Sequence, residues 1–551
     1  MNINLVKSFR GAEEHIEVEK GTTIEELYYK IKDEVPYQIV GAKINNKVES
    51  LRYIVKEECR VELLDMRDQN ANMIYQNSLI LLYLRAVQCV FGDVAVDIDN
   101  AINQGLYTKV GLSEITEEDV EAIKVKMDEL VRSNLPIVEE QLSKEEATAF
   151  FRKKGCEEKV DLLDEITGNI VFYNLDGYKE MFYGHAVPST GYLKYYELRK
   201  YKSGILLRMP QQSLPDAIAP YSDEKMLYKT FGEQHEWGEI MKINYVCDLN
   251  KRIKEGKFTE LVQLSEALHE KRIVEIAEMI NEQRKRIVLI AGPSSSGKTT
   301  FAQRLCIQLR VCGLDPIYMG TDDYFVERED TPLDEYGEKN YEDLEAVDVK
   351  LFNSNMKDLL EGKTVDMPTF DFITGKKIFG KRMTTINSNQ ILVIEGIHAL
   401  NEVLTAEIPK EDKFKIYISP LTQLNIDRHN RIVTTDHRML RRLVRDYKYR
   451  GHSAKSTISN WSKVRAGEDK NIFPYSNEAD VLFNSSHLYE ISVLKKYAKP
   501  LLESVSPEDE EYGDAERLLD FLMFFQTVDD DSAIVNNSIL REFIGGSIFV
   551  D

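Results

Sequence analysis

The sequence predicts a multidomain protein of the α/β and α+β classes, with a parallel-sheet domain placed after two smaller mixed domains. Its 551 residues exceed what one hydrophobic core usually organises, so several domains are expected. From residue 286 to about 505, strand and helix signals alternate, which indicates βαβ units around a parallel sheet. Within this part, residues 292–299 read GPSSSGKT, a complete G-x-x-x-x-G-K-[ST] pattern between an expected strand and an expected helix.

Residues 1–66 are predicted to form a small β-rich domain with one helix. Strand-like runs cover residues 1–6, 15–18, 38–44 and 60–64, and a helical pattern covers residues 23–35. The stretch TTIEE at residues 22–26 is typical of a capped helix start, because a threonine hydroxyl group can accept the free N–H groups of the first turn.

The other boundaries follow from changes in pattern along the chain. Residues 67–240 mix helical and strand-like runs, which predicts an α+β domain. Residues 241–285 are charged and helical in period, with a narrow apolar stripe suited to packing one domain on the next. Residues 286–505 form the predicted parallel-sheet domain. The acidic run SPEDEE opens a last segment, residues 506–551, expected to be a solvated linker followed by a helical segment.

Composition restricts the class of protein. Apolar residues make up 43% and charged residues 30%, and no apolar run approaches the length of a membrane span, so we expect a cytoplasmic protein without membrane contact. Six scattered cysteines without a C-x-x-C pair indicate reduced thiols. The net charge of −22 repels polyanions on average, so RNA binding would need a local basic patch. The composition leaves a homo-oligomer open.

The GPSSSGKT stretch predicts a site for a nucleoside triphosphate, with ATP as the expected cofactor. Glycines let the backbone turn tightly, so that its N–H groups and the start of the following helix converge on phosphate oxygens. Lys298 can reach the β- and γ-phosphates, and the Thr299 hydroxyl group can bind Mg²⁺. The predicted nucleotide-binding residues are Gly292, Ser294, Ser295, Ser296, Gly297, Lys298, Thr299 and Thr300.

Two later strands end in carboxylates that would face the bound triphosphate. Asp322 and Asp323 follow the strand at 315–320, and one of them could accept the proton of an attacking hydroxyl group. The alternative for this pair is a helix or turn cap. Glu395 ends a buried strand at 390–395 and is expected to share the Mg²⁺ site with Thr299, unless it is only an acid at the edge of the core.

A run of arginines predicts a basic helix face. Arg438, Arg441, Arg442 and Arg445 are spaced i, i+3, i+4, i+7, which places four guanidinium groups on one side of a helix. Since an unbroken arginine stripe implies anionic ligands, we expect a lid over the transferred phosphate. A solvated basic face or an RNA-contacting patch is the alternative.

These motifs together resemble the uridine–cytidine kinase and phosphoribulokinase group of P-loop kinases. The matching stretches are GPSSSGKT at 292–299, TDDYF at 321–325, NYE at 340–342, MPTFDF at 367–372, VIEG at 393–396, the arginine run at 438–445 and ADVLF at 479–483. The resemblance implies that Asp323 acts as general base near the metal, that Lys298, Arg442 and Arg445 assist transfer, and that Thr299 and Glu395 bind Mg²⁺. It further implies that Glu342, Phe370, Phe372, Arg450 and Asn460 contact the acceptor.

The expected base pocket departs from this family. Where its nucleoside kinases carry Y-D-F-x-x-H, this chain reads FDFITG at 370–375. The tyrosine after the catalytic loop is replaced by Val326, and an arginine after the lid by His452. Buried hydrogen-bonding groups discriminate between substrates far more strongly than methyl contacts do, so the acceptor stays open between a uridine- or cytidine-like nucleoside and another ribose-containing molecule.

The front half resembles threonyl-tRNA synthetase. Residues 1–66 are similar to its TGS domain, and residues 67–240 to its second, editing domain through AINQGLY at 101–107 and VPSTG at 187–191. The editing motifs H-x-x-x-H and C-x-x-x-H fall here on Asn77 and Leu81 and on Phe182 and Ala186, so editing chemistry is predicted to be absent. His185, one place off, is read as a structural histidine.

The sequence thus predicts an ATP- and Mg²⁺-dependent phosphotransferase of the uridine kinase type, acting on an alcohol group of a small nucleoside-like acceptor. A rival from another class is an RNA- or ribosome-associated NTPase that binds tRNA through its front half. A third hypothesis, a pseudokinase that binds nucleotide without transfer, is disfavoured by Lys298, Asp323 and Arg445.

Overall fold

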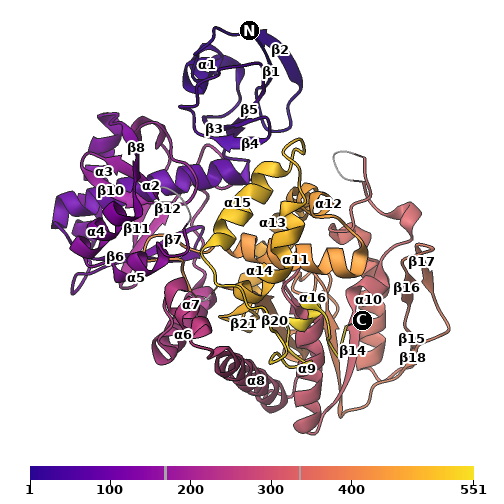
Figure 1. Cartoon of the computed structure of the whole chain (residues 1–551). Helices are drawn as coiled ribbons and strands as arrows, with labels where there is room; N and C mark the ends of the chain where they lie inside the picture. Colours follow the sequence, from indigo (N-terminus) through magenta and orange to yellow (C-terminus); the bar gives the residue numbers. More distant parts are fainter. Residues whose placement is uncertain (167–169, 334–336, 423, 551) are drawn as a thin grey trace.

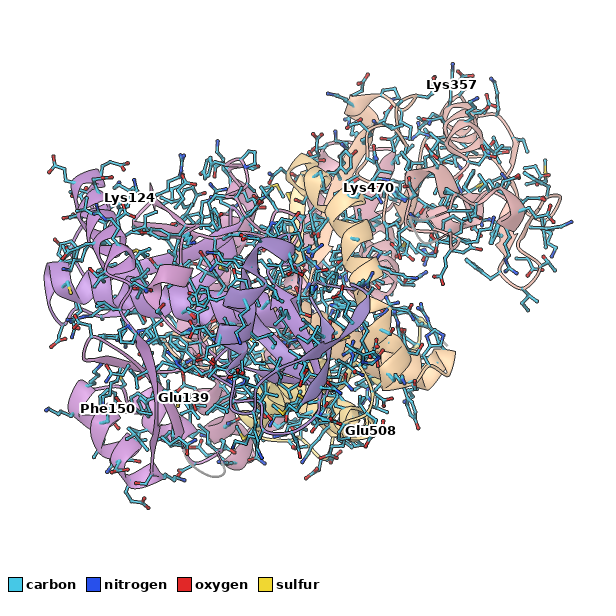
Figure 2. All side chains as sticks on the ribbon, turned by 90° about the horizontal axis from the view of Figure 1, so that it is seen from above. Lys124, Glu139, Phe150, Lys357, Lys470 and Glu508 are labelled. Carbon is cyan, nitrogen blue, oxygen red and sulfur yellow. The ribbon has the colours of Figure 1, made fainter. Side chains whose placement is uncertain are left out.

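The computed structural model describes residues 1–166, 170–333, 337–422 and 424–550 (Figure 1). Three regions follow one another: a small N-terminal sheet, a mixed α+β region, and a parallel-sheet region into which the C-terminal helices are packed. In the view from above, Lys124 and Phe150 of the α+β region lie at the opposite end of the molecule from Lys357 (Figure 2). No helix among the described residues is both long and apolar enough to cross a bilayer.

The N-terminal region is a five-stranded mixed sheet in the order β2-β1-β5-β3-β4, with β1 parallel to β5 and the other pairs antiparallel. Its elements are β1 (Asn2–Val6), β2 (Glu13–Glu17), α1 (Ile24–Lys30), β3 (Ile39–Ile44), β4 (Lys47–Glu49) and β5 (Arg60–Asp65). The predicted helix start is confirmed: Thr23 and Glu26 form a reciprocal cap at the beginning of α1. Ile24 and Leu27 of α1 are buried against the sheet.

The α+β region contains two antiparallel sheets and a long buried helix, α2 (Gln69–Phe91). The four-stranded sheet has the order β11-β12-β7-β6, and the three-stranded sheet has the order β10-β9-β8. The strands are β6 (Val96–Ile102), β7 (Gly105–Val110), β8 (Ile137–Leu142), β9 (Ile170–Leu175), β10 (Tyr178–Met181), β11 (Glu197–Tyr201) and β12 (Gly204–Arg208). Helices α3 (Glu117–Arg132), α4 (Lys144–Lys154) and α5 (Glu157–Leu162) complete the region.

Three helices connect the front half to the parallel sheet: α6 (Lys225–Met241), α7 (Val246–Lys254) and α8 (Phe258–Glu282). The second half of the apolar stripe of α8 packs as its period indicates, whereas Leu264 in the first half is exposed. Ile273, Ile276 and Ile280 are fully buried in the same apolar cluster as α9 (Lys298–Val311). This segment therefore anchors one face of the helix that follows the phosphate loop.

The third region is built on a five-stranded parallel sheet in the order β14-β19-β13-β20-β21. These strands are β13 (Ile287–Ala291), β14 (Asp315–Gly320), β19 (Gln390–Glu395), β20 (Lys413–Ser419) and β21 (Val481–Asn484). Both faces are covered, since Leu289 belongs to one apolar cluster and Val288 to another. Burial on both faces explains why the strands read as almost continuous apolar runs.

Helices and two short hairpins surround this sheet. The helices are α10 (Val349–Leu360), α11 (Thr434–Arg450), α12 (Ala454–Ser459), α13 (Trp461–Asn471), α14 (Glu490–Glu503), α15 (Tyr512–Met523) and α16 (Arg541–Ile544). The hairpins pair β15 (Val365–Asp366) with β18 (Met383–Thr384), and β16 (Thr369–Asp371) with β17 (Lys376–Ile378).

The C-terminal segment is an integral part of the core. The acidic residues Glu508 and Glu510 are exposed, as expected of a linker, but Leu518 and Phe521 of α15 are fully buried. In Figure 1, α15 (yellow) lies among α11 to α14 (orange) and reaches toward β4 of the N-terminal sheet. Asn70 donates to Asp514 Oδ1 at 3.0 Å, which ties α15 to the start of α2.

Candidate active site

The phosphate loop joins β13 to α9 at the carboxyl end of the parallel sheet. Gly292 is required by close approach, because a Cβ atom there would lie 2.1 Å from the carbonyl oxygen of Ile418. Gly297 has a φ of +83°, a left-handed conformation that favours glycine. Lys298 Nζ donates to the carbonyl oxygens of Gly292 at 3.0 Å and Pro293 at 3.3 Å. The side chain therefore folds back over the loop, within reach of a phosphate held there.

Thr299 and Glu395 lie together, as a shared metal site requires. The Thr299 hydroxyl group donates to Glu395 Oε1 at 2.9 Å, and the Tyr318 hydroxyl group donates to the same oxygen at 2.7 Å. Glu395 Oε2 is buried with no hydrogen-bond partner among the described residues. Burial raises the pKa of Glu395, while the Lys298 charge and the two hydroxyl donors lower it. A hydroxyl oxygen and a spare carboxylate oxygen are hard ligands that fit Mg²⁺.

The two aspartates after β14 point to different partners. Asp323 accepts from Arg382 Nη1 at 2.7 Å and from the Phe370 N–H at 3.4 Å, so its carboxylate is engaged by the β15–β18 region. Asp322 is open to solvent, yet it is surrounded by enough protein to raise its carboxyl pKa, against the opposing charges of Lys298 and Arg450. Asp322 therefore lies in the electrostatic field of the phosphate loop and the arginine helix.

The arginine face of α11 divides into two pairs with different surroundings. Arg438 and Arg441 are almost fully buried and form ion pairs with Glu468 and Glu490. The expectation that all four guanidinium groups serve anionic ligands was wrong for these two, because carboxylates of the chain itself already neutralise them. They instead hold the loop: Arg438 Nε donates to Ser294 O at 3.0 Å, and Arg441 Nη1 to Ser295 O at 3.2 Å.

The remaining arginines share one buried carboxylate, Asp446. Arg442 Nε lies 3.2 Å from Asp446 Oδ2, and Arg445 and Arg450 lie 3.0 and 3.4 Å from Asp446 Oδ1. Arg442 Nη1 also donates to the Ser294 hydroxyl group at 2.8 Å. Three cations on one carboxylate leave a net positive charge beside the loop, where an anion is favoured.

Two of the expected acceptor residues, Phe370 and Phe372, lie in one aromatic group. Phe370 and Phe372 have ring centroids 5.2 Å apart, and Phe325 lies 5.7 Å from Phe370. The charges of the loop region act on the Glu342 carboxyl group. Burial and Glu468 raise its pKa, while Arg442 and Lys298 lower it. Asn460 is exposed and donates to Ser456 O at 2.9 Å, so its amide group lies at the end of α12.

Where the resembled family carries a histidine, Gly375 has a φ of +71° and lies against Arg328. A Cβ atom at Gly375 would come within 2.6 Å of the Arg328 Cβ atom. Arg328 Nη1 donates to the carbonyl oxygen of Ile373 at 3.3 Å. At the position of that histidine, this chain therefore places an arginine side chain against the backbone.

Several residues of this site escaped prediction. Tyr318, Arg382 and Glu468 each contact a predicted residue, yet none belongs to a motif. Glu468 Oε1 accepts the N–H of Ser294 at 2.9 Å from 174 residues further along the chain. No local pattern marks these three residues, and the local signal of the acidic pair at 322–323 did not distinguish its two members.

The positions that would carry editing chemistry in the front half are apolar or structural. Leu81, Phe182 and Ala186 belong to the hydrophobic core. Asn77 donates to the carbonyl oxygen of Tyr183 at 3.0 Å, and His185 Nε2 lies 3.1 Å from the carbonyl oxygen of Val48. His185 thus joins the second region to the N-terminal sheet.

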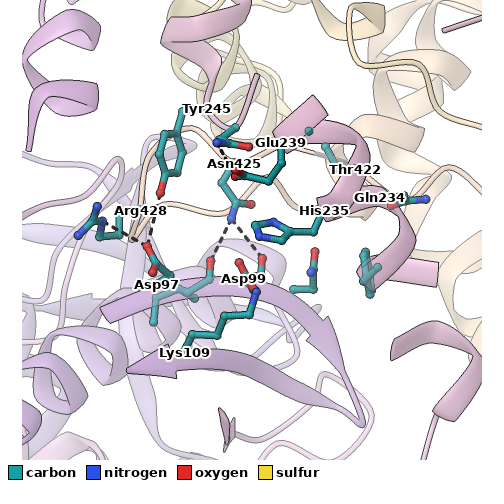
Figure 3. Close-up of a pocket in the computed structure, with 15 residues that line it drawn as sticks. Asp97, Asp99, Lys109, Gln234, His235, Glu239, Tyr245, Thr422, Asn425 and Arg428 are labelled. Atoms are coloured by element: carbon teal, nitrogen blue, oxygen red, sulfur yellow. Dashed lines mark hydrogen bonds and ion pairs between the residues drawn. The ribbon is translucent and has the colours of Figure 1, made fainter. Parts of the chain in front are cut away.

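A polar pocket of about 260 Å³ lies where the front half meets the parallel-sheet region (Figure 3). Arg428 Nε lies 3.2 Å from Asp97 Oδ1, and the Tyr245 hydroxyl group donates to the same atom at 3.4 Å. Asn425 Nδ2 donates to the carbonyl oxygens of Ile98 at 3.0 Å and Asp99 at 3.2 Å. These contacts connect the two halves of the molecule.

A group of three potential metal ligands lies apart from the phosphate loop. Ligand atoms of Glu266, His269 and His487, all buried, lie within 4.8 Å of one another. Arg304 already pairs with Glu266 at 3.2 Å, and the two imidazole rings lie with their centroids 4.0 Å apart and their planes tilted by 31°. Because an adjacent guanidinium group disfavours a second cation, we assign this group to the packing of α8 against α9.

Comparison with known proteins finds different relatives for the front third of the chain and for its parallel-sheet region. Residues 287–492 match the model of the Phosphoribulokinase / Uridine kinase family. The threonine–tRNA ligase of Caldanaerobacter subterraneus is 33% identical over 181 residues, 32% of this chain and 28% of that protein. Threonine–tRNA ligase 1 of Bacillus subtilis is 32% identical over 185 residues, 33% of this chain and 29% of that protein. The chain thus covers less than a third of the length of these ligases.

Among solved structures, one described as a possible uridine kinase from Bacillus stearothermophilus aligns with 39% of this chain and 98% of its own, at 18% identity and a TM-score of 0.27. By the match to the family model, residues 287–492 resemble P-loop kinases of the phosphoribulokinase and uridine kinase family, and the front third resembles the N-terminal region of threonine–tRNA ligase.

Proposed function

We propose that this protein is an ATP- and Mg²⁺-dependent kinase that transfers the γ-phosphate to a hydroxyl group of a nucleoside or a related ribose-containing molecule. One observation carries the proposal: Lys298, the Thr299–Glu395 pair and Arg442 gather around one phosphate loop at the carboxyl end of the sheet. Ligands of open α/β sheets bind at this edge, and phosphoryl transfer depends mainly on positioning and charge stabilisation.

Each residue then has a distinct task. Lys298 and the loop N–H groups hold the triphosphate, and Thr299 with Glu395 Oε2 would bind Mg²⁺, which offsets phosphate charge when it is present. Arg442 and Arg445 face the transferred group from α11 and stabilise the charge that develops on it. Arg450, half-exposed at the end of the same helix, is proposed to contact the acceptor or its phosphate.

The general base is proposed to be Asp322, with Asp323 as the alternative. A base must lie within hydrogen-bond reach of the acceptor hydroxyl group and stay free to take its proton. Asp323 accepts hydrogen bonds from Arg382 and from the Phe370 N–H of β16, so its carboxylate is already occupied. Asp322 experiences the charges of Lys298 and Arg450, and its own charge acts on Glu342. Glu342 is proposed to hold the ribose hydroxyl groups, and Phe370 and Phe372 to line the base.

A panel assay tests this function. ADP release is measured with ATP and Mg²⁺ against nucleosides and ribose-like alcohols, for the parent protein, Asp322→Asn, Asp323→Asn and the exposed control Asp330→Asn. Turnover that depends on one acceptor, persists in the control and falls by about 10²–10⁴-fold in Asp322→Asn supports the proposal. A comparable loss confined to Asp323→Asn would move the role of base to that residue. Acceptor-independent turnover in every variant would overturn the kinase proposal.

The front half supports a second candidate function. Its strand order β2-β1-β5-β3-β4 with one crossing helix supports a β-grasp, TGS-like domain, and the next region is proposed to be an editing-like domain without editing chemistry. Its similarity to threonine–tRNA ligases favours an RNA- or ribosome-associated NTPase that binds tRNA. Adding tRNA to the panel assay separates the two, since only this candidate predicts RNA-stimulated ATP turnover without an acceptor.

A further inference from the structure

The C-terminal segment packs directly on the phosphate loop. Ile539 and Phe543 are fully buried in the same apolar cluster as Phe301 and Leu305 of α9. A Cβ atom added at Gly297 would lie 2.4 Å from Ile539 Cγ2, so Ile539 occupies the space immediately beside that glycine. The segment is therefore held against the loop by apolar contacts that a merely solvated tail would lack.

Glu542 of this segment occupies anion-binding groups of the loop. Its Oε2 atom accepts from the backbone N–H of Thr300 at 3.2 Å and from the Thr300 hydroxyl group at 2.8 Å. Thr300 lies in the first turn of α9, where unpaired N–H groups and the helix dipole favour a negative charge. Both residues are buried, with Glu542 7% and Thr300 0% exposed. A carboxylate thus stands where a phosphate oxygen would bind.

The surroundings of Glu542 make a second anion at this position unfavourable. Its charge acts on Glu395, since it raises the pKa of that carboxyl group. The neighbouring residue Phe543 packs against Arg441, whose Cζ atom lies 4.8 Å from the centroid of the phenylalanine ring. The Thr300 N–H can donate to one strong acceptor at a time, so a phosphate bound there would have to displace the Glu542 carboxylate. If the carboxylate stayed in place, the two negative charges would repel each other.

From this contact we infer that Glu542 is an internal competitor of the nucleotide, which keeps the phosphate loop in an autoinhibited state until the carboxylate swings away from Thr300. This inference depends on one part of the proposed function, namely that the loop binds a nucleotide. Loss of the Thr300 contact removes a polar anchor of the segment around Glu542, so we expect the backbone hydrogen bonds of this segment to open more often. Lys448 Nζ donates to Ile544 O at 2.6 Å, which links this segment to the arginine helix α11.

The test measures ADP binding rather than turnover, by titration calorimetry with Mg²⁺. The variants are Glu542→Gln, which keeps the shape without the charge, Glu542→Ala, and the control Glu503→Gln, which removes an exposed charge at the end of α14. We expect both Glu542 variants to bind ADP about tenfold or more tightly than the parent, in line with the strength of charge-assisted hydrogen bonds, and the control to bind within about twofold. Unchanged or weaker binding by Glu542→Gln would overturn the inference.

The parent protein supplies a measurement that does not depend on a variant. Hydrogen exchange of the peptide around Glu542 should increase when ADP is added, because the Thr300 contact is lost. Decreased or unaltered exchange in a protein that binds ADP would overturn the inference while leaving the nucleotide site in place. Absence of ADP binding in every protein would overturn both this inference and the proposed kinase function.

Discussion

Arg438 and Glu468 form a buried ion pair directly beneath the phosphate loop. The same Glu468 oxygen accepts the N–H of Ser294, while Arg438 Nε donates to the carbonyl oxygen of that serine. One serine of the loop is thus held on both sides of its backbone by helices α11 and α13. The pair sets the shape of the loop before any ligand arrives.

The first prediction separates the arginines that hold the loop from those proposed to act in phosphate transfer. Arg438→Met should lower the stability of the kinase domain by about 3–5 kcal/mol, because it leaves Glu468 buried without its cation. Arg442→Met should cost about 1 kcal/mol or less, since Arg442 is more exposed and Asp446 keeps Arg445, but it should lower kcat. Thermal unfolding and ADP release are measured for both. Equal thermal shifts in the two variants would contradict this division.

The second prediction concerns the proposed metal site. Glu395→Gln should raise the Mg²⁺ concentration for half-maximal activity by about tenfold or more, because the amide removes the charge of the proposed metal ligand. Tyr318→Phe removes one hydroxyl donor to Glu395 and should have the same effect more weakly. The control is Glu411→Gln on the surface. A Mg²⁺ requirement that does not move in Glu395→Gln would remove this residue from the site.

The third prediction concerns the contact between the two halves of the chain. Glu180 accepts from Lys159 at 2.6 Å and pairs with His429 at 2.6 Å, in a cluster that also includes Asp427. Glu180→Gln should lower stability by up to about 3–5 kcal/mol, since it removes one of the two carboxylates that pair with the buried Lys159. The partly exposed pair of Glu140 and Lys179 provides the control, because Glu140→Gln should cost about 1 kcal/mol or less. Denaturant unfolding followed by domain-specific proteolysis measures both.

The fourth prediction concerns pH. Burial lowers the pKa of His487 to about 3 and of His398 to about 4. In the unfolded chain both histidines protonate near pH 6.5, whereas in the folded protein they stay neutral until the pH is much lower. The folded state then binds fewer protons, so stability is full above about pH 6.5 and declines as the pH falls toward those values. Each histidine should contribute a loss of about 2 kcal/mol between pH 6.5 and 5.

Unfolding midpoints at pH 7.5 and 5.0 test this dependence. His398→Leu should show a smaller difference between the two midpoints than the parent, because one buried titrating group is gone. The exposed His235→Asn should behave as the parent does. A difference that is the same in all three proteins would show that His398 does not carry the acid sensitivity.

Much of the kinase region could be predicted because its signals are local. The loop GPSSSGKT, the apolar strands and Glu395 after its strand are contiguous patterns, and parallel strands bring their carboxyl ends to one edge. The arginine period likewise predicted a shared helix face. It could not reveal that Glu468 and Glu490, 30 and 49 residues further on, neutralise Arg438 and Arg441. The boundaries of the domains and the individual roles of the site residues stay predictions.

The sequence by itself determined a phosphate-binding loop on a parallel sheet, a synthetase-like front half and a set of charged side chains at spacings that local geometry dictates. The tertiary structure decided which of these charges remain available to a ligand. It paired Asp323 with Arg382, buried two arginines, and placed Glu542 on Thr300 from 242 residues away. The physical reason is that the partners and the burial of an ionised group determine whether it can bind a ligand. Distant segments supply both only once the chain has folded.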